Sequence, residues 1–332
     1  MMDSAVQSPS ASSVEAVLRA ELAAADVAAG TVAPILQHLL DNGANSIFSD
    51  AIVAGVRGMA SDLARQLLDA RAQAAGEAEK VEHTAAERAA LSGAMTGNPA
   101  LLGHLHALAL EWQLTQQMQA RLAFDPVLSP LLQAQMAASD PETAALAMKF
   151  LAAQARFCQE QRRMQLPLTE LPGDLLHGVL VAMRTLAGFG AGFGAGVEAG
   201  VEADAQAAGA ETAIRKEFNE ARSRLGLAAR LVAGMGGGGL AALSITHAGA
   251  ALFLTALALA SGQDRDLAVL SANESQTARL ALALRAAGLK QAAVEEQFLA
   301  LHPDVALPEG FDQLGPDRAA ALLAAAGPLA GG

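Results

Sequence analysis

The sequence predicts an all-α protein, and three observations support that prediction. Of the 332 residues, 52% are hydrophobic, and alanine, the best helix former, supplies much of that share. Aromatic residues amount to only 3% and tyrosine is absent, so the residue types that strands prefer are scarce. Apolar residues recur at intervals of three and four, the spacing of one helix face. We therefore expect about a dozen helices, packed as an irregular antiparallel array of the HEAT-like or helical-bundle kind.

Local start signals divide the first half of the chain into helices. Ser12 and Glu15 form a capping-box pattern that opens the first helix. Asp140 and Pro141 give the clearest start, because an N-cap residue is followed by a proline at the first helical position. The expected helices of this half are 13–28, 31–40, 46–74, 77–95, 99–123, 127–136 and 141–165.

A glycine-rich tetrapeptide repeat occupies residues 188–203, with a glycine at every fourth position. If it is helical, Gly196 and Gly200 share a face and let a partner helix approach closely. Each such glycine costs a helix about 1 kcal/mol relative to alanine, so a mobile linker is the alternative. We favour a helix from Gly196 onward because Val197 and Glu198 restore an amphipathic pattern.

The second half continues as short helices, with glycines 236–239 as a hinge or loop. The expected helices are 174–187, 196–235, 240–246, 249–261, 264–271, 275–287, 291–301 and 316–325. The whole chain is then expected to comprise a disordered lead 1–12, an N-terminal helical region 13–187, the repeat 188–203, a C-terminal helical region 204–326 and a frayed tail 327–332.

Charge and cysteine content limit the classes of function. The formal net charge of −12 argues against a nucleic-acid partner, because phosphate backbones require clustered cations. The densest basic group, Arg156, Arg162 and Arg163, is either a solvated helix face or a contact for a protein partner. Cys158 is the single cysteine, which excludes an intrachain disulfide. Because the first residues also lack the pattern of a signal peptide, we expect a cytoplasmic protein.

Sets of catalytic residues are hard to find in this sequence. Glu79, His83 and Glu87 lie four apart on one face of an expected helix and are the best candidate for a metal site, but a solvated surface ladder is the preferred interpretation. The glycines at 234–239 match the dinucleotide fingerprint, but a helix rather than a strand precedes them. We therefore expect no catalytic residues and no cofactor.

The run 231–262 contains no Asp, Glu, Lys or Arg and is long enough to cross a membrane. Four consecutive glycines interrupt it, and no Trp or Tyr anchors its ends. A pair of buried helices is therefore the preferred interpretation. A membrane-associated protein that uses this run and the glycine repeat remains the alternative.

One pattern resembles a known family. The pattern is Phe253-x-x-Ala256-Leu257-Ala258-x-x-Ser261-Gly262, followed by Arg279-Leu280 and Ala287-Gly288-Leu289. It is similar to an alphaproteobacterial domain of unknown function of the DUF2336 type, over about residues 171–301. The resemblance implies a cytoplasmic helical array without known catalysis, and it transfers no functional residue.

The function that these observations favour is a non-enzymatic protein-interaction or scaffolding role in a bacterium with high genomic GC, with signalling as one setting. The candidate interaction or packing residues are Gly196, Gly200, Arg156, Arg162 and Arg163. A membrane-associated protein is the first alternative. A helical metal-dependent enzyme is the second, and it depends on Glu79, His83 and Glu87 alone.

Overall fold

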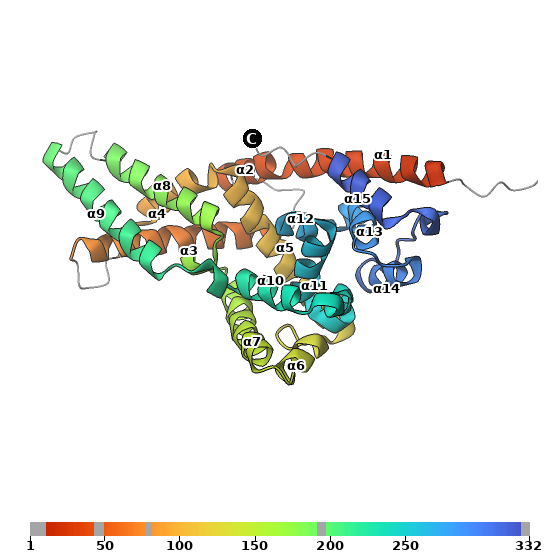
Figure 1. Cartoon of the computed structure of the whole chain (residues 1–332). Coiled ribbons are helices and arrows are strands. Elements are labelled where there is room, and N and C mark those ends of the chain that lie inside the picture. The colour runs from red at the N-terminus through yellow and green to blue at the C-terminus, as the bar shows by residue number, and fades with distance from the viewer. Residues whose placement is uncertain (1–10, 43–49, 77–81, 191–196, 327–332) are drawn as a thin grey trace, which may run out of the picture. The chain divides into compact units, whose positions relative to one another are not determined.

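The computed structural model describes residues 11–42, 50–76, 82–190 and 197–326 (Figure 1). Within these residues the protein has 15 α-helices and no strand. The all-α prediction is confirmed, and the expected number of helices is close to the observed one.

The first half of the chain contains eight α-helices in the described residues. Their bounds are α1 Ala11–Gly30, α2 Val32–Asn42, α3 Asp50–Ala74, α4 Ala85–Thr96, α5 Pro99–Leu122, α6 Pro130–Met136, α7 Pro141–Arg162 and α8 Gly173–Gly190. A short 3₁₀ helix, η1, covers Leu168–Glu170 between the last two.

The second half contains seven more α-helices and four 3₁₀ helices among the described residues. Their bounds are α9 Val197–Glu217, η2 Glu220–Arg222, α10 Arg224–Gly234, η3 Gly236–Leu243, α11 Ile245–Ser261, α12 Arg265–Ser271, η4 Glu274–Gln276, α13 Thr277–Ala286, α14 Gln291–Leu301, η5 Phe311–Gln313 and α15 Pro316–Ala325.

Several details of the expected helices were wrong. The glycines 236–239, expected as a hinge or loop, belong to the 3₁₀ helix η3, Gly236–Leu243. The first helix begins at Ala11, so the Ser12 capping box does not open it. The helix expected from residue 77 begins at Ala85, because Thr84 and Glu87 form the capping box that starts it. The stretch 196–235 was expected either to run on as one helix or to start again within it, and it starts again: α9 ends at Glu217 and α10 begins at Arg224. The expected lead 1–12 and tail 327–332 fall mostly outside the described residues.

The chain forms two compact units, and each is assembled from separated segments. Unit 1 comprises Met1–Val32, Gln113–Ala147 and Leu231–Gly332, and unit 2 comprises Ala33–Trp112 and Met148–Arg230. These limits differ from the sequential regions 13–187 and 204–326 expected from the sequence. The helices α5, α7 and α10 each contribute residues to both units.

Unit 1 is organised around α11 and α13. The helix α11 packs against α6, α12, α13, α14 and η3, and α13 packs against α1 and α15 as well. Every residue of α11 from Ala251 to Ala258 is buried. This segment lies in the second half of the uncharged run 231–262, and its side chains pack inside unit 1.

Gly249 shapes this core. Its φ is +72°, which kinks α11. A Cβ at this position would lie 3.3 Å from the Cβ of Ser129, just before α6. The residue therefore supplies both a left-handed backbone conformation and a close approach to its neighbour.

Unit 2 contains a four-helix bundle. The helices α3, α4, α8 and α9 contact one another in a closed order, each touching two of the others (Figure 1). A Cβ at Gly209 of α9 would lie 3.2 Å from the Cβ of Ala74 in α3, so this glycine allows the two helices to approach closely.

An ion pair lies in the interior of unit 2. The Arg224 guanidinium donates to Glu111 Oε1 at 2.7 Å and to Glu111 Oε2 at 2.9 Å. It also lies 3.7 Å from the centre of the Phe157 ring. The relative exposure of the two charged residues is 2% and 1%. Burial acts to lower the pKa of Arg224, but the Glu111 carboxylate outweighs that effect, and the pKa is raised from its ordinary value.

Length and composition identify one helical stretch in the described residues that could cross a membrane, Ser13–Leu40. Two bent pairs pass the same test only if each pair is counted as one span: α10 with η3, bent by 119°, and α11 with α12, bent by 113°.

Candidate functional site

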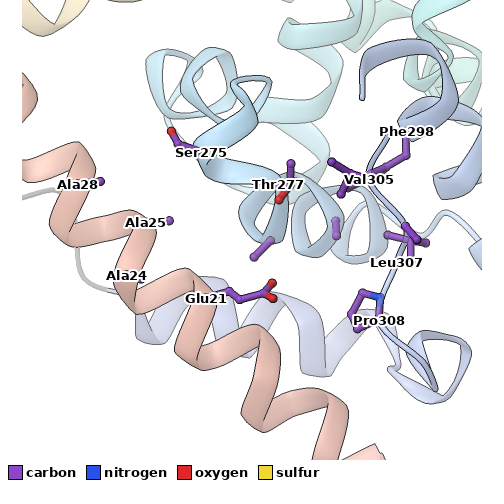
Figure 2. Close-up of a pocket in the computed structure, with 13 residues that line it drawn as sticks. Glu21, Ala24, Ala25, Ala28, Ser275, Thr277, Phe298, Val305, Leu307 and Pro308 are labelled. Atoms are coloured by element: carbon purple, nitrogen blue, oxygen red, sulfur yellow. The ribbon is translucent and has the colours of Figure 1, made fainter. Parts of the chain in front are cut away.

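A groove in unit 1 is the candidate functional site, and Figure 2 shows it. It has a volume of about 450 Å³. We name it the α1/α13 groove. Its lining residues are Glu21, Ala24, Ala25 and Ala28 of α1, Thr277, Ala278 and Ala281 of α13, and Ser275, Phe298, Val305, Ala306, Leu307 and Pro308.

The groove exists because short side chains face one another. The lining positions on α1 are spaced by three, one and three residues, which places them on one face of the helix. Most of these positions are alanine, as are two of the three lining positions on α13. Alanine fills little volume, so the two helices can be joined at their contacts and still leave space between them.

Polar contacts of α1 hold it beside this space. The Gln276 side chain donates from Nε2 to the Ala25 carbonyl oxygen at 2.7 Å, although the two residues are 251 positions apart in sequence. Arg279 forms an ion pair with Asp26. Arg318 of α15 donates to Glu15 at 2.7 Å. The Glu15 carboxylate is therefore already engaged in a contact within unit 1.

Glu21 is the one charged residue among those that line the groove. Figure 2 shows its side chain extending from α1 into the space beside Pro308. Among the described residues it forms no hydrogen bond or ion pair, and Thr277 adds a hydroxyl group nearby. The opposite wall is apolar and includes Phe298, Val305 and Leu307. Such a surface can receive apolar groups together with one cation.

The residues proposed for a metal are not brought together as the sequence suggested. His83 precedes α4, and its Nε2 atom lies 2.9 Å from Asp69 Oδ1. Glu87 accepts from the backbone N–H of Thr84 at 2.8 Å. This hydrogen bond is the largest cause of the lowered pKa of Glu87. Glu79 lies outside the described residues.

The shared helix face assumed for these three residues is therefore wrong for His83 and Glu87. The structure contains no group of three or more His, Cys, Asp or Glu side chains placed to hold a metal ion, within the ranges that it describes.

The five candidate interaction or packing residues fall in different places. Arg156 lines a pocket of unit 2, whereas Arg162 and Arg163 are exposed at the end of α7 and do not line it. Gly196 lies outside the described residues. Gly200 is in α9, which begins at Val197, close to the expected start. The surroundings of Gly200 are also outside what the structure describes.

Sequence reasoning missed Glu21 and Gln276, because each becomes informative only when α1 and α13 lie together. It also missed the pair of Glu111 and Arg224. A signal for Glu111 existed, since this carboxylate follows the apolar stretch 107–110, where an unpaired charge would be costly. The expected core residue Trp112 is only half-buried, whereas Cys158 is buried as expected.

Comparison with family models found no matching family. Searches of curated proteins and of solved structures found no match either. The resemblance to the DUF2336 type therefore stays a prediction, and the groove must be interpreted from its own chemistry.

Proposed function

We propose that this chain is a non-enzymatic protein-interaction module whose α1/α13 groove receives a short segment of a partner protein. The segment carries apolar side chains and one lysine or arginine. The observation that carries this proposal is the unpartnered Glu21 carboxylate at the edge of an apolar groove. A cation in the partner would complement that charge, and the apolar side chains would be removed from water.

The size of the groove supports a segment rather than a whole surface. Pockets that bind ligands measure about 300–1,000 Å³, and the volume of this groove, about 450 Å³, falls in that range. A few anchoring side chains carry most of the affinity of typical interfaces, so a groove of this size is sufficient for one apolar anchor and its neighbours.

The chemical groups of the groove also favour binding over catalysis. Its polar side chains are one carboxylate and the hydroxyls of Ser275 and Thr277, and no histidine or cysteine lines it. One carboxylate beside two hydroxyl groups is suited to recognition of a partner. We extend the proposal to a cytoplasmic scaffold of the kind used in signalling, because helical proteins present extended surfaces to partners.

Selection from a displayed library of random peptides tests this proposal. The wild-type chain should enrich peptides that combine apolar residues with one Lys or Arg. An Ala24→Phe variant should lose them, because the larger side chain fills the groove. Ala23→Phe is the matched control, since Ala23 is an exposed neighbour on α1 that does not line the groove.

Two outcomes would reject the proposal. One is the absence of any enriched sequence with the wild-type chain. The other is enrichment that survives Ala24→Phe unchanged, because peptides would then be binding elsewhere on the surface.

Membrane association is the second candidate, and the Ser13–Leu40 stretch is the observation that favours it. Vesicle flotation distinguishes the two proposals. A peptide-binding module should stay in the soluble fraction with or without Val27→Asp, whose native side chain is 72% exposed. A membrane-inserted α1 should float with vesicles, and the aspartate should prevent this because a charge is costly in hydrocarbon.

A further inference from the structure

A pocket of unit 2 is unusually rich in cations. It has a volume of about 360 Å³, and its lining residues are Lys149, Ala152, Arg156, Arg222, Leu227 and Arg230. We name it the basic pocket. Lys149, Ala152 and Arg156 recur at three- and four-residue intervals on α7, so they lie on one face of that helix. The other cations come from η2 and α10.

These positive charges are not neutralised by the protein. None of the four basic side chains forms an ion pair within the part of the chain that the structure describes. Arg230 makes only a long hydrogen bond of 3.4 Å to the Ala221 carbonyl oxygen. Other arginines of the same unit do have carboxylate partners, such as Arg184 with Asp204 and Arg215 with Glu211.

One carboxylate influences the basic pocket without lining it. Glu160 lies one helical turn beyond Arg156, and its pKa is raised by burial and by the neighbouring Glu170. Arg156 acts in the opposite direction on that pKa. Glu160 carries at most one negative charge, so it cannot cancel the charges of the four basic side chains that line the pocket.

We propose that the basic pocket binds a small, soluble, multiply charged phosphate compound. Four cations concentrated in a protein of net charge −12 create a local positive field that attracts anions. A phosphate monoester carries about −1.5 to −2 charges and three acceptor oxygens, which match several donors at once. A ligand with a single carboxylate would leave most of these donors without an acceptor.

The chemical nature of the donors also favours phosphate. Three of the four cations are arginines, whose planar guanidinium groups can each donate two parallel hydrogen bonds to phosphate oxygens. Ala152 and Leu227 add apolar wall beside the charges, where a small organic group attached to the phosphate can pack. This site lies in unit 2 and is independent of the α1/α13 groove.

Isothermal titration of the full-length chain with inorganic pyrophosphate tests the proposal, with sodium chloride at matched ionic strength in the cell. Saturable binding of one pyrophosphate per chain is expected. The double variant Arg156→Gln/Arg230→Gln should weaken the affinity at least tenfold. The double variant Arg162→Gln/Arg163→Gln is the control and should change it less than twofold, since these exposed arginines lie outside the pocket.

A thermal-unfolding series keeps the test valid if a variant is poorly folded. Without ligand, Lys149→Gln should unfold at the wild-type temperature or higher, because it relieves repulsion among like charges. Pyrophosphate should raise the unfolding temperature of the wild type and of Arg162→Gln/Arg163→Gln, and it should raise that of Lys149→Gln less.

The proposal is overturned if pyrophosphate does not saturate, or if both double variants lose affinity equally. It is also overturned if the protein binds phosphatidylcholine vesicles that contain phosphatidic acid, if that binding is lost in Arg156→Gln/Arg230→Gln, and if pyrophosphate does not bind. That result would assign the pocket to a lipid headgroup.

Discussion

The two units contain few aromatic residues, and they bury different kinds of side chain in their cores. Around α11, unit 1 buries a continuous run of apolar side chains from Ala251 onward, with Thr255 as its only hydroxyl up to Ala258. Unit 2 places the charged pair of Arg224 and Glu111 inside its core with both partners buried, whereas the buried Arg279 of unit 1 pairs with a less buried carboxylate, that of Asp26. The comparison teaches that an uncharged run can be packed inside a helical unit, and that an isolated charge in an apolar stretch can indicate a distant partner.

The two sites differ in the same way as the two cores. The α1/α13 groove has one carboxylate on a largely apolar surface. The basic pocket has four cations and only two apolar residues. The partner proposed for the groove would therefore meet one charged residue, whereas the ligand proposed for the basic pocket would meet four.

Breaking the buried ion pair of unit 2 should have the largest effect. Glu111→Ala leaves the Arg224 guanidinium buried without its carboxylate, and we expect a loss of about 3–5 kcal/mol in the free energy of unfolding. Urea denaturation followed by circular dichroism measures this loss.

Replacing both charged partners is the control. The double variant Glu111→Leu/Arg224→Met should recover much of the stability, because no charge is then left buried. A Glu111→Ala loss below about 1 kcal/mol would show that the pair is not a buried structural link.

Truncating the apolar core of unit 1 should have the next largest effect. Leu257 is fully buried in α11, so Leu257→Ala should cost about 2–5 kcal/mol. Leu259→Ala on the same helix is the matched control, because Leu259 is 53% exposed. Equal losses for the two variants would contradict the placement of α11 at the centre of unit 1.

A glycine of unit 2 gives a smaller expected effect. A Cβ at Gly226 would lie 2.2 Å from the Glu220 carbonyl oxygen, so Gly226→Ala should cost about 1–3 kcal/mol through steric overlap. Gly103→Ala in α5 meets no atom within 4 Å and should instead stabilise its helix by up to about 1 kcal/mol. Changes of opposite sign in the free energy of unfolding would confirm that Gly226 lies close to the Glu220 carbonyl. No change in Gly226→Ala would exclude this close approach.

The smallest expected effect concerns pH and His302 of unit 1. Burial lowers the pKa of His302 below its ordinary value of 6.5, and Arg121 acts in the same direction, while Glu274 and a backbone hydrogen bond to Ala272 oppose it. The folded protein therefore binds fewer protons than the unfolded chain. The stability contributed by neutral His302 is present above pH 6.5 and is lost as the pH falls below that value.

Urea midpoints at about pH 7.5 and about pH 5.5 measure this contribution. The wild type should lose more stability between the two pH values than His302→Gln does. The other histidines titrate in both proteins, so the difference between the two isolates His302. An identical pH dependence would show that this side chain is not desolvated.

Much of the fold could be predicted from local signals. Asp140 accepts from the Thr143 backbone N–H at 2.9 Å at the start of α7, as the N-cap interpretation requires. Asp264 caps α12 in the same way. The start of α4 was also encoded, in the sequence Thr84-Ala-Ala-Glu87, but the surrounding charge pattern favoured a longer helix.

The candidate sites could not be predicted, because they depend on distant segments. Arg156 belongs to the basic group identified in the sequence, but Arg222 and Arg230 join it only through the fold of unit 2. The α1/α13 groove likewise depends on contacts such as that of Gln276 with Ala25, 251 positions away. Helix periodicity determines which face is buried, and it does not specify which other helix covers that face.

The central claim is that Glu21 recognises a basic side chain of a partner segment, and a double-mutant cycle tests it most directly. Fluorescence anisotropy gives the affinities of the library-selected peptide, and of the same peptide with its basic residue replaced by Met, for the wild type and for Glu21→Gln. We predict a coupling free energy of about 0.5–1 kcal/mol, the range of an exposed ion pair. The same cycle with Glu296→Gln, an exposed residue of α14 outside the groove, should give none. If the losses of binding free energy caused by Glu21→Gln and by the Met replacement in the peptide are additive, the claim is contradicted.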